Sequence, residues 1–511
     1  MGYYLGIDAG TQSIKGILID PEKGVVTPAV SVHFGNELSR YNSPGGFLPN
    51  EDPLIRHADP LMWLDALDLL LQKMYSSGMP LEQVSGISGS GQQHGTLYFN
   101  DRFPERLSSL KQELSLAEQL KDTFSRKSAP IWMDGSTAGE CKKLAVRFGE
   151  MIREKTGSFP AERFSGPQIM KFAQEEPEAW QKTARVHLVS SFFASVLAGE
   201  SMPIDHGDGA GMNLLDLACG QWDREIAEFT APSLLDKLPD CVPSSQVRGK
   251  LAPYFSKYGL PGGIPVTVWS GDNPNSLIGC GGTDPRTAVI SLGTSDTFFG
   301  TLRSFEEAPK RAGHIFGHPA GGFMSLICFS NGSLTREHFR KEYGLSHEEF
   351  DSLAASAVRG KYQMLPFLFP EATPPVSVPG IRGNFDPLKV TAGERILSLL
   401  ESQFLTMRYH AELKYSPCEI RLTGGASASP FLRQLAADIF QAPVLIGNSA
   451  ESAALGAAMR SANSVAGVDF GRLAEIFCKA EVRIAPDPAL GKTYERALEE
   501  FAKLLHERNS L

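Results

Sequence analysis

Residues 3–20 read YYLGIDAGTQSIKGILID, and this stretch decides the fold of the first part of the chain. An apolar run ends at Asp8, Gly10 and Thr11 turn the chain, and a second apolar run starts at Ile14. The pattern predicts a strand, a tight turn and a second strand. The N–H groups of such a turn and a threonine hydroxyl can bind a phosphate, because glycine lets the backbone approach a ligand closely. Asp8 is placed to hold a metal ion beside that phosphate.

A similar hairpin is predicted much later in the chain, where residues 287–302 read TAVISLGTSDTFFGTL. Gly293 and Thr294 lie in the turn between its two apolar runs. Two such hairpins, one in each half, favour two related domains that close on one polyphosphate. The alternative is that both segments are ordinary β-hairpins.

Length and composition indicate a globular protein of more than one domain. A chain of 511 residues is too long for one hydrophobic core, and its 42% hydrophobic and 21% charged residues are ordinary for a soluble protein. The net charge of −9 and the absence of a long basic run argue against a nucleic-acid partner. The most apolar helix candidate, residues 187–199, is too short to span a membrane, so we expect no membrane partner. Seven scattered cysteines without a CxxC pair suit reduced thiols and a cytoplasmic protein.

Strand-like runs alternate with helical patterns along the chain, which predicts an α/β architecture of helices packed on sheets. Residues 60–79 and 392–413 have helical periodicity, and residues 84–91 and 419–423 read as strands.

The domain boundary is expected in a stretch rich in Pro, Ser and Gly at residues 238–263. We therefore expect a first domain over residues 1–250, which binds the substrate, and a second over residues 251–511, which binds a nucleotide. The final helix, residues 494–506, is a candidate for packing back on the first domain.

Asp272 follows the strand-like run VTVWSG and lies in the turn Gly271-Asp272-Asn273-Pro274. In an α/β protein, an acid at the carboxyl end of a strand lies where ligands bind. A carboxylate there can take the proton of a hydroxyl group as that hydroxyl attacks phosphorus. The alternative is a helix N-cap, because Asp is a common cap before a helical run.

Gln93 and His94 end another predicted strand, and their amide and imidazole groups can hydrogen-bond a polyol. Trp132 and Arg163 can add an aromatic wall and a charge, as in sugar sites. Simpler explanations remain open, because a lone histidine is usually structural and Arg163 can be an ordinary surface residue.

Two further segments contain glycine or acidic residues at turns. Gly424 and Gly425, between a strand and a helix, let the backbone approach a flat ring or a phosphate, although a Gly-Gly pair is also common in turns. Residues 205–208 together with Asp216 lack the spacing of a calcium loop, and we interpret them as a turn-rich structural segment.

These segments, in this order, resemble the FGGY family of carbohydrate kinases, and within it the eukaryotic type of xylulokinase. The resemblance runs from residue 6 to about residue 460 and so covers nearly the whole chain. The matching stretches are GIDAGTQSIKG (6–16), SGSGQQHG (88–95), IWMDGSTAGEC (131–141), ERFSGPQI (162–169), IDHGDGAGMNLLD (204–216), SGDNPNSL (270–277), SLGTSDT (291–297) and TGGASAS (423–429).

The resemblance implies two actin-like (ribonuclease H-like) ATPase domains with a deep interdomain cleft. It also implies transfer of a phosphoryl group from ATP, with Mg²⁺, to a sugar hydroxyl; a xylulokinase makes D-xylulose 5-phosphate from D-xylulose. The implied partners are the small-molecule sugar and ATP, and we expect a monomer or a homodimer.

Carried over position by position, the resemblance implies that Asp272 is the catalytic base and that Asp8 lies beside the metal and the phosphates. It assigns further residues to three groups. They are Gly10, Thr11, Gly293 and Thr294 around the phosphates, His94, Arg163, Asp272 and Asn273 on the sugar, and Gly424 and Gly425 at the adenosine. Gln93 and Trp132 join the sugar group on the chemistry of their side chains.

The chain departs from the family pattern at three places. Gln93 stands where many bacterial members carry Met, and Asp296 stands where many carry Gly. Residues 427–429 lack the Asn that some relatives offer to the nucleotide. These departures bear on the nucleotide contact and on whether substrate identity can be transferred from bacterial relatives.

Other readings of the same residues remain open. A kinase of this fold can act on ribulose, gluconate or glycerol instead. An actin- or chaperone-type ATPase needs the phosphate hairpins but no base aimed at a sugar, and the pairs Asp272-Asn273 and Gln93-His94 favour the kinase. A catalytically inactive sugar sensor is the third reading, and the presence of both Asp8 and Asp272 argues against it.

Overall fold

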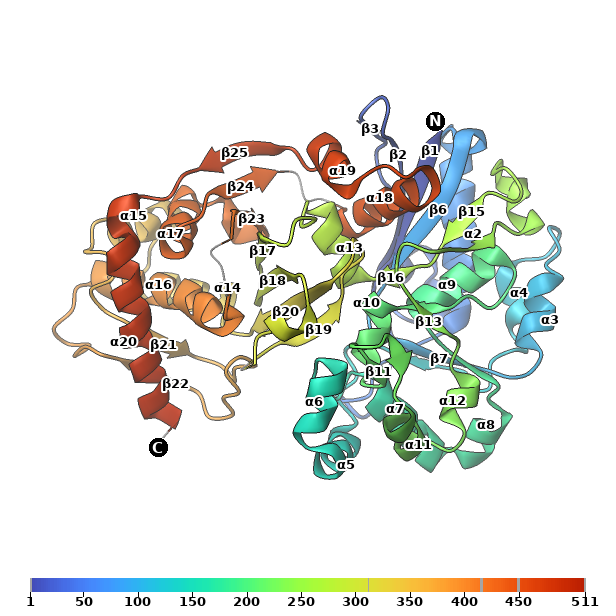
Figure 1. The fold of residues 1–511 in the computed structure, drawn as a ribbon, viewed down its shortest axis with the longest axis horizontal. Helices are drawn as coiled ribbons and strands as arrows, with labels where there is room; N and C mark the ends of the chain where they lie inside the picture. Colours follow the sequence, from blue (N-terminus) through green and yellow to red (C-terminus); the bar gives the residue numbers. More distant parts are fainter. Residues whose placement is uncertain (1, 311, 414–416, 448–450, 510–511) are drawn as a thin grey trace. The chain divides into compact units, whose positions relative to one another are not determined.

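The computed structural model describes residues 2–310, 312–413, 417–447 and 451–509 (Figure 1). The chain divides into two compact units. The first contains Met1–Thr283, Ile315–Phe323 and Ala450–Cys478; the second contains Asp284–His314, Met324–Ser449 and Lys479–Leu511. The chain therefore returns to the first unit twice after leaving it, briefly at Ile315–Phe323 and again at Ala450–Cys478, and the last residues of the division belong to the second unit.

The first unit is built on one mixed sheet, and its central hairpin is the predicted one. The sheet order is β14 (Val247–Lys250), β15 (Pro265–Thr267), β6 (Val84–Gly91), β1 (Tyr3–Ala9), β2 (Ser13–Asp20) and β3 (Val25–Val26), with β16 (Ser270–Gly271) paired to β6 and β4 (Val30–His33) paired to β2. β1 runs antiparallel to β2 and parallel to β6. The turn is closed by Gly10, whose N–H donates to the Ser13 carbonyl oxygen at 3.0 Å.

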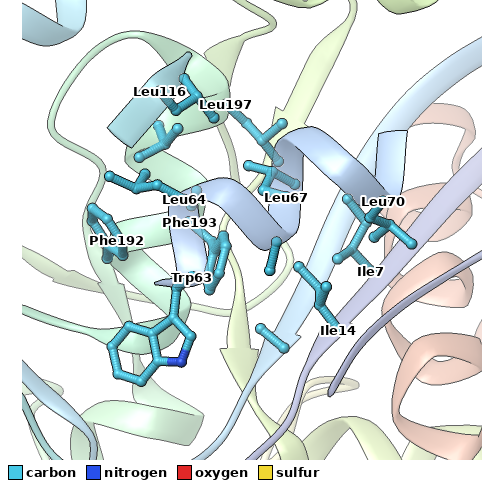
Figure 2. Packing of buried hydrophobic residues seen from close by; sticks show 14 of the residues in the cluster. Ile7, Ile14, Trp63, Leu64, Leu67, Leu70, Leu116, Phe192, Phe193 and Leu197 are labelled. Carbon is cyan, nitrogen blue, oxygen red and sulfur yellow. The ribbon is translucent and has the colours of Figure 1, made fainter. Parts of the chain in front are cut away.

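A helical core covers this sheet. α2 (Pro60–Ser76) begins at a proline, and the side chain of Asp59 accepts a hydrogen bond from the Leu61 N–H at 2.8 Å, which caps the helix. Its apolar residues recur at helical spacing, and burying each leucine stabilises the unit by about 1.5–3 kcal/mol. Figure 2 shows Trp63, Leu64, Leu67 and Leu70 of α2 among Ile7 and Ile14 of the central hairpin, Leu116, and Phe192, Phe193 and Leu197 of α9 (Val189–Ala198).

α9 lies within the segment that the sequence marks as the most apolar helix candidate, and its residues are buried in this core. Among the residues that the structure describes, no helix combines the length and apolar character needed to cross a membrane.

The second unit repeats the central strand arrangement of the first. Its sheet order is β19 (His314–Gly317), β20 (Phe323–Phe329), β18 (Asp296–Leu302), β17 (Thr287–Leu292), β23 (Glu419–Thr423), β24 (Val444–Gly447) and β25 (Ala480–Ile484). β17 runs antiparallel to β18 and parallel to β23, as β1 runs antiparallel to β2 and parallel to β6. The second predicted hairpin is therefore confirmed, and each unit has the strand pattern of an actin-like ATPase domain.

The end of the first unit differs from the expected division at residue 250. Residues 251–283 belong to the first unit because β15 and β16 pair with β6, and because α13 (Asp272–Gly279) packs on α18 (Ser452–Ala466). The Pro-, Ser- and Gly-rich composition of residues 238–263 reflects turns around β14 and a short 3-10 helix, Pro253–Tyr258.

α18 belongs to the first unit because small residues let it touch the backbone of other elements (Figure 1). A Cβ atom on Gly6 of β1 would lie 2.1 Å from the Ala454 carbonyl oxygen. A Cβ atom on Gly456 would lie 1.9 Å from the Asn275 carbonyl oxygen of α13. Because real side chains do not fit at such distances, only glycine permits these contacts.

The final helix lies elsewhere than the sequence indicates. α20 (Gly491–Asn509) belongs to the second unit, not the first. Its Tyr494 hydroxyl donates a hydrogen bond to the buried carboxylate of Glu401 in α16 (Ala392–Ala411) at 2.8 Å. Apolar Tyr494, Phe501 and Leu505 are buried in the core of the second unit, which explains the placement.

Candidate active site

Three predicted site segments of the first unit meet at one edge of its sheet. β1 and β16 both run parallel to β6, and Ser90 of β6 is the register partner of both Asp8 and Ser270. The carboxyl ends of the three strands therefore lie side by side, where α/β proteins bind ligands. Asp8 is next to last in β1, and Asp272 directly follows β16 as the first residue of α13.

The Asp8 and Asp272 carboxyl groups are electrostatically coupled. Burial raises the pKa of Asp272 to about 7, and the charge of Asp8 contributes in the same direction. Burial also raises the pKa of Asp8 to about 6, although the Ser90 hydroxyl and the Lys15 charge act against it. Lys15 itself is paired with Glu451 across 2.8 Å. Two acids with raised pKa values at a strand edge are typical of an active site.

Asn273 links the Asp272 turn to the loop after β6. Its amide nitrogen Nδ2 donates to Gln93 Oε1 at 2.7 Å, and its backbone N–H donates to Asp272 Oδ1 at 2.9 Å. The residue before α13 is Gly271, and Asp272 does not act as the N-cap. Gln93 Nε2 is buried and has no hydrogen-bond partner among the described residues, which makes it a donor suited to a ligand oxygen.

His94 lies in a left-handed conformation (φ 69°) and is held on two sides. Its Nδ1 lies 3.0 Å from the Gly211 carbonyl oxygen, so Nδ1 carries the proton and donates it. Its ring stacks on Phe164 with the ring centroids 4.5 Å apart, and the guanidinium of Arg163 lies 5.9 Å from the centroid of the same Phe164 ring. The structure thus places His94 and Arg163 around one aromatic ring.

Trp132 connects to the turn of the first hairpin. Its indole Nε1 donates to the Thr11 hydroxyl at 2.8 Å, and that hydroxyl lies 3.3 Å from Gln92 Oε1. Trp132 stays 44% exposed. An exposed indole beside the turn is in position to form the aromatic wall that the sequence indicates.

The surroundings of Asp8 suit a magnesium ion. Its Oδ1 atom is buried and accepts no hydrogen bond from the described residues. Among the residues that the structure describes, no group of three or more His, Cys, Asp or Glu side chains is arranged to hold a metal ion. Mg²⁺ commonly binds through one or two carboxylates while phosphate oxygens and water complete its shell, so a single carboxylate fits this metal.

The predicted phosphate and nucleotide residues of the second unit also lie together. Gly293 and Thr294 form the turn between β17 and β18. Gly424 has φ 87°, and a Cβ atom on it would lie 2.5 Å from the carbonyl oxygen of Leu292, the residue before that turn. Glycine at 424 is therefore required, because the backbone packs against the end of β17 with a positive φ.

A cavity of about 570 Å³ opens beside Gly425, a size typical of small-molecule sites. α14 (Ser333–Glu342), α15 (His347–Ala355), α16 and α17 (Pro430–Phe440) contribute side chains to it. Of the residues expected at the adenosine, Gly425 lines this cavity.

Arg336 of α14 lines the same cavity, although sequence reasoning did not select it. Its two terminal nitrogens donate to Asp296 Oδ2 at 2.7 Å and to Asp296 Oδ1 at 2.9 Å. The buried pair connects α14 to the start of β18, directly after the turn that contains Gly293 and Thr294. This contact accounts for Asp at a position where many family members carry Gly. No motif surrounds Arg336, so only its position in space reveals it.

Asp208 is a second residue that sequence reasoning does not select, because residues 205–208 are interpreted as a turn-rich structural segment. Asp205 Oδ1 accepts the Asp208 N–H at 2.8 Å, which caps the short helix α10 (His206–Gly209) and agrees with the structural interpretation. The Asp208 side chain, however, is buried and accepts a hydrogen bond from the Ser190 hydroxyl. Burial raises its pKa well above the usual range, and the charges of Asp205 and Asp272 add to this. Asp208 therefore lies near Asp272.

Family models match both units. The model described as "FGGY family of carbohydrate kinases, N-terminal domain" matches residues 121–279, and its C-terminal counterpart matches residues 288–465. The interval between the two matches contains the boundary between the units at Thr283.

Individual proteins match over almost the whole chain. "Xylulose kinase" of Rattus norvegicus is 39% identical, covering 98% of this chain and 96% of its own. "Xylulose kinase 2" of Arabidopsis thaliana is 36% identical, covering 90% and 87%. In structure, the chain is similar to a kinase titled "xyloylose kinase" from Brucella ovis, with a TM-score of 0.81 at 22% identity and 99% of both chains covered.

Proposed function

This chain belongs to the FGGY family of carbohydrate kinases, and we propose that it transfers the terminal phosphoryl group of ATP to D-xylulose, giving D-xylulose 5-phosphate. The observation that carries the proposal is Asp272 at the sheet edge, beside Asn273 and Gln93, in a chain 39% identical to a xylulose kinase over nearly its full length. A base aimed at a bound hydroxyl is what a sugar kinase needs and what a filament-forming or chaperone-type ATPase lacks.

Asp272 acts as the general base in this proposal. A sugar hydroxyl is a poor nucleophile while it keeps its proton, and the Asp272 carboxylate accepts that proton as the oxygen–phosphorus bond forms. A base whose pKa lies near 7 is partly deprotonated at neutral pH and is basic enough to accept the hydroxyl proton, which is what general-base catalysis requires.

The remaining residues of the first unit bind and orient the sugar. Gln93 Nε2 offers a donor to a sugar oxygen, and Asn273 holds the opposite end of the same amide. His94 and Arg163 supply further polar groups around Phe164, and Trp132 supplies an apolar wall. Together they present several hydrogen-bonding groups and a flat apolar surface, the combination that polyols require.

Asp8 would hold Mg²⁺ through its unpartnered Oδ1 atom, and the Gly10 and Thr11 turn would lie beside the phosphates. The metal, when bound, neutralises charge on the phosphate oxygens. The turn at Gly293 and Thr294 binds phosphate, and the nucleoside occupies the cavity beside Gly425. Gly424, the residue before it, packs against the end of β17. For the oligomeric state of the protein we propose a monomer or a homodimer, and for its location the cytoplasm.

The pH dependence of the reaction follows from the raised pKa of Asp272. The base works only when deprotonated, so we expect kcat/KM for the sugar to rise about tenfold per pH unit below pH 7 and to level off above it. Steady-state rates between pH 5.5 and 8.5 measure this, with the coupling enzymes in excess at every pH. A profile that is flat from pH 5.5 to 8.5 in the wild type would contradict the assignment.

Substrate identity is tested with an ADP-release assay on purified protein. D-xylulose should be the fastest acceptor in a panel with ribulose, gluconate and glycerol, and omission of Mg²⁺ should abolish turnover. A much higher kcat/KM for glycerol or ribulose would overturn the choice of sugar. Release of phosphate from ATP at the same rate without any sugar would overturn the kinase assignment itself.

A further inference from the structure

Arg460 of α18 is a fully buried arginine, 0% exposed. Its hydrogen-bond acceptors in the described part of the chain are carbonyl and amide oxygens. They are Gly89 O at 3.4 Å and Asn275 Oδ1 at 3.2 Å from one terminal nitrogen, and Ser244 O at 2.7 Å and Val268 O at 2.6 Å from the other.

Three of the four acceptors of Arg460 lie on segments that lead to the site, and the fourth, Ser244 O, lies between β13 (Cys241–Val242) and β14. Gly89 is in β6, which leads to Gln93, and Val268 lies just before β16, which leads to Asp272. Asn275, in the first turns of α13, continues the network, since its Nδ2 donates to the Gly271 carbonyl oxygen at 2.9 Å and to Gly89 O at 3.3 Å. Gly271 is the residue directly before Asp272.

A guanidinium group in this place is costly to bury, because carbonyl oxygens replace only part of its hydration. An apolar side chain could fill the same space without that cost. What arginine alone provides is a rigid planar fork that holds several oxygens at fixed positions. Arg460 holds oxygens of strand β6, of helix α13, and of the residues Val268 and Ser244 between strands.

We infer that Arg460 is a positioning residue for Asp272, fixing the start of α13 against the end of β6 through Asn275 and the Val268 carbonyl group. This inference rests on the proposed role of Asp272 as the base. Arg460 does not touch the substrate; it sets where the Asp272 carboxylate lies when the sugar hydroxyl is bound. Displacing a catalytic group by about 1 Å can cost on the order of 10²-fold in rate, so loss of the fork should appear in kcat.

Arg460→Lys is the first test. Lysine keeps the positive charge but has no planar fork to span these oxygens. We expect kcat to fall by up to about 100-fold, the cost of displacing a catalytic group by about 1 Å, while KM for ATP stays within about twofold. Ser461→Ala is the matched control, because Ser461 is the next residue of α18, is equally buried, and its hydroxyl has no partner among the described residues. The control should keep wild-type kcat.

Asn275→Ala is the second test and applies also if Arg460→Lys does not fold. It removes the link to Gly271 while leaving the Arg460 bonds to Ser244 and Val268 in place. The kcat of this variant should fall as well. In the double variant Arg460→Lys/Asn275→Ala, the fold-decrease in kcat should be smaller than the product of the two single decreases, because both substitutions break the same hydrogen-bond network.

The outcomes separate this inference from the proposed function. Wild-type kcat in a folded Arg460→Lys or Asn275→Ala protein, even with a lower melting temperature, would overturn the positioning role. Multiplicative effects in the double variant would also overturn it. Full activity of Asp272→Asn would instead overturn the base on which the inference rests.

Discussion

Asp272→Asn is expected to lower kcat about 10²- to 10⁴-fold, the usual contribution of general-base assistance. Asparagine keeps the size of the side chain and can still accept the hydrogen bond from the Asn273 N–H, but it cannot take the proton of the sugar hydroxyl. Because burial raises the pKa of Asp272, its ionised form is disfavoured in the folded protein, and the neutral amide should not lower the melting temperature at pH 8.

Asp469→Asn provides the matched control for this substitution. Asp469 is a true N-cap in the same unit, with its side chain accepting the Arg472 N–H at 3.2 Å, and asparagine caps a helix about as well. We expect the control to change neither kcat nor melting temperature. Near-normal kcat in a stable Asp272→Asn protein would remove Asp272 from the mechanism and return it to a purely structural role.

Gly456→Ala is expected to destabilise the first unit, although the same change usually stabilises an exposed helix by up to about 1 kcal/mol. The new Cβ atom would lie 1.9 Å from the Asn275 carbonyl oxygen, and a Cβ on Gly279 would lie 1.9 Å from that of Ser452. The two helices must therefore move apart. Such overpacking costs about 1–3 kcal/mol, so the melting temperature should fall. Because α13 begins with Asp272, kcat should fall too.

Gly139→Ala tests whether the effect comes from the crossing of the two helices. Gly139 lies in α5 (Ala138–Phe148), and nothing lies within 4 Å of where its Cβ would be placed. Calorimetry should show an unchanged or slightly raised melting temperature for this variant. Equal behaviour of the two alanine variants would mean that α13 and α18 do not require their close approach.

Local features of the sequence predict the strands and the strand-end residues well. Gly10-Thr11 and Gly293-Thr294 both lie in hairpin turns, because apolar runs on either side of a glycine have few other solutions. The rule that ligands bind at the carboxyl ends of parallel strands brings Asp8, the Gln93 loop and Asp272 to one edge of the sheet.

Features that depend on distant parts of the chain escape the same reasoning. The small residues of α18 predict a helix but do not identify Gly6 and Gly279 as its partners. Sequence reasoning therefore misses the domain boundary near Thr283 and the return of α18 to the first unit. The role of Arg336 follows only from its ion pair with Asp296, which is 40 positions away in the sequence. Asp208 lies in a segment whose capping bonds already explain its sequence pattern, and only its burial near Asp272 reveals more.

The return of α18 to the first unit has a consequence for synthesis on the ribosome. The sheet strands and α13 of that unit emerge long before α18, since the interval between Gly279 and Ser452 takes on the order of 10–30 s at about 5–20 residues per second. During that time Gly6, Gly279 and the carbonyl groups that Arg460 later binds have no partner from α18, and the nascent chain is exposed to aggregation and to chaperones. The first unit cannot finish folding before α18 and α19 (Phe470–Phe477) are made, and the second unit cannot finish before α20 is made. A premature stop after residue 447 therefore disables the whole protein, not only its final helices.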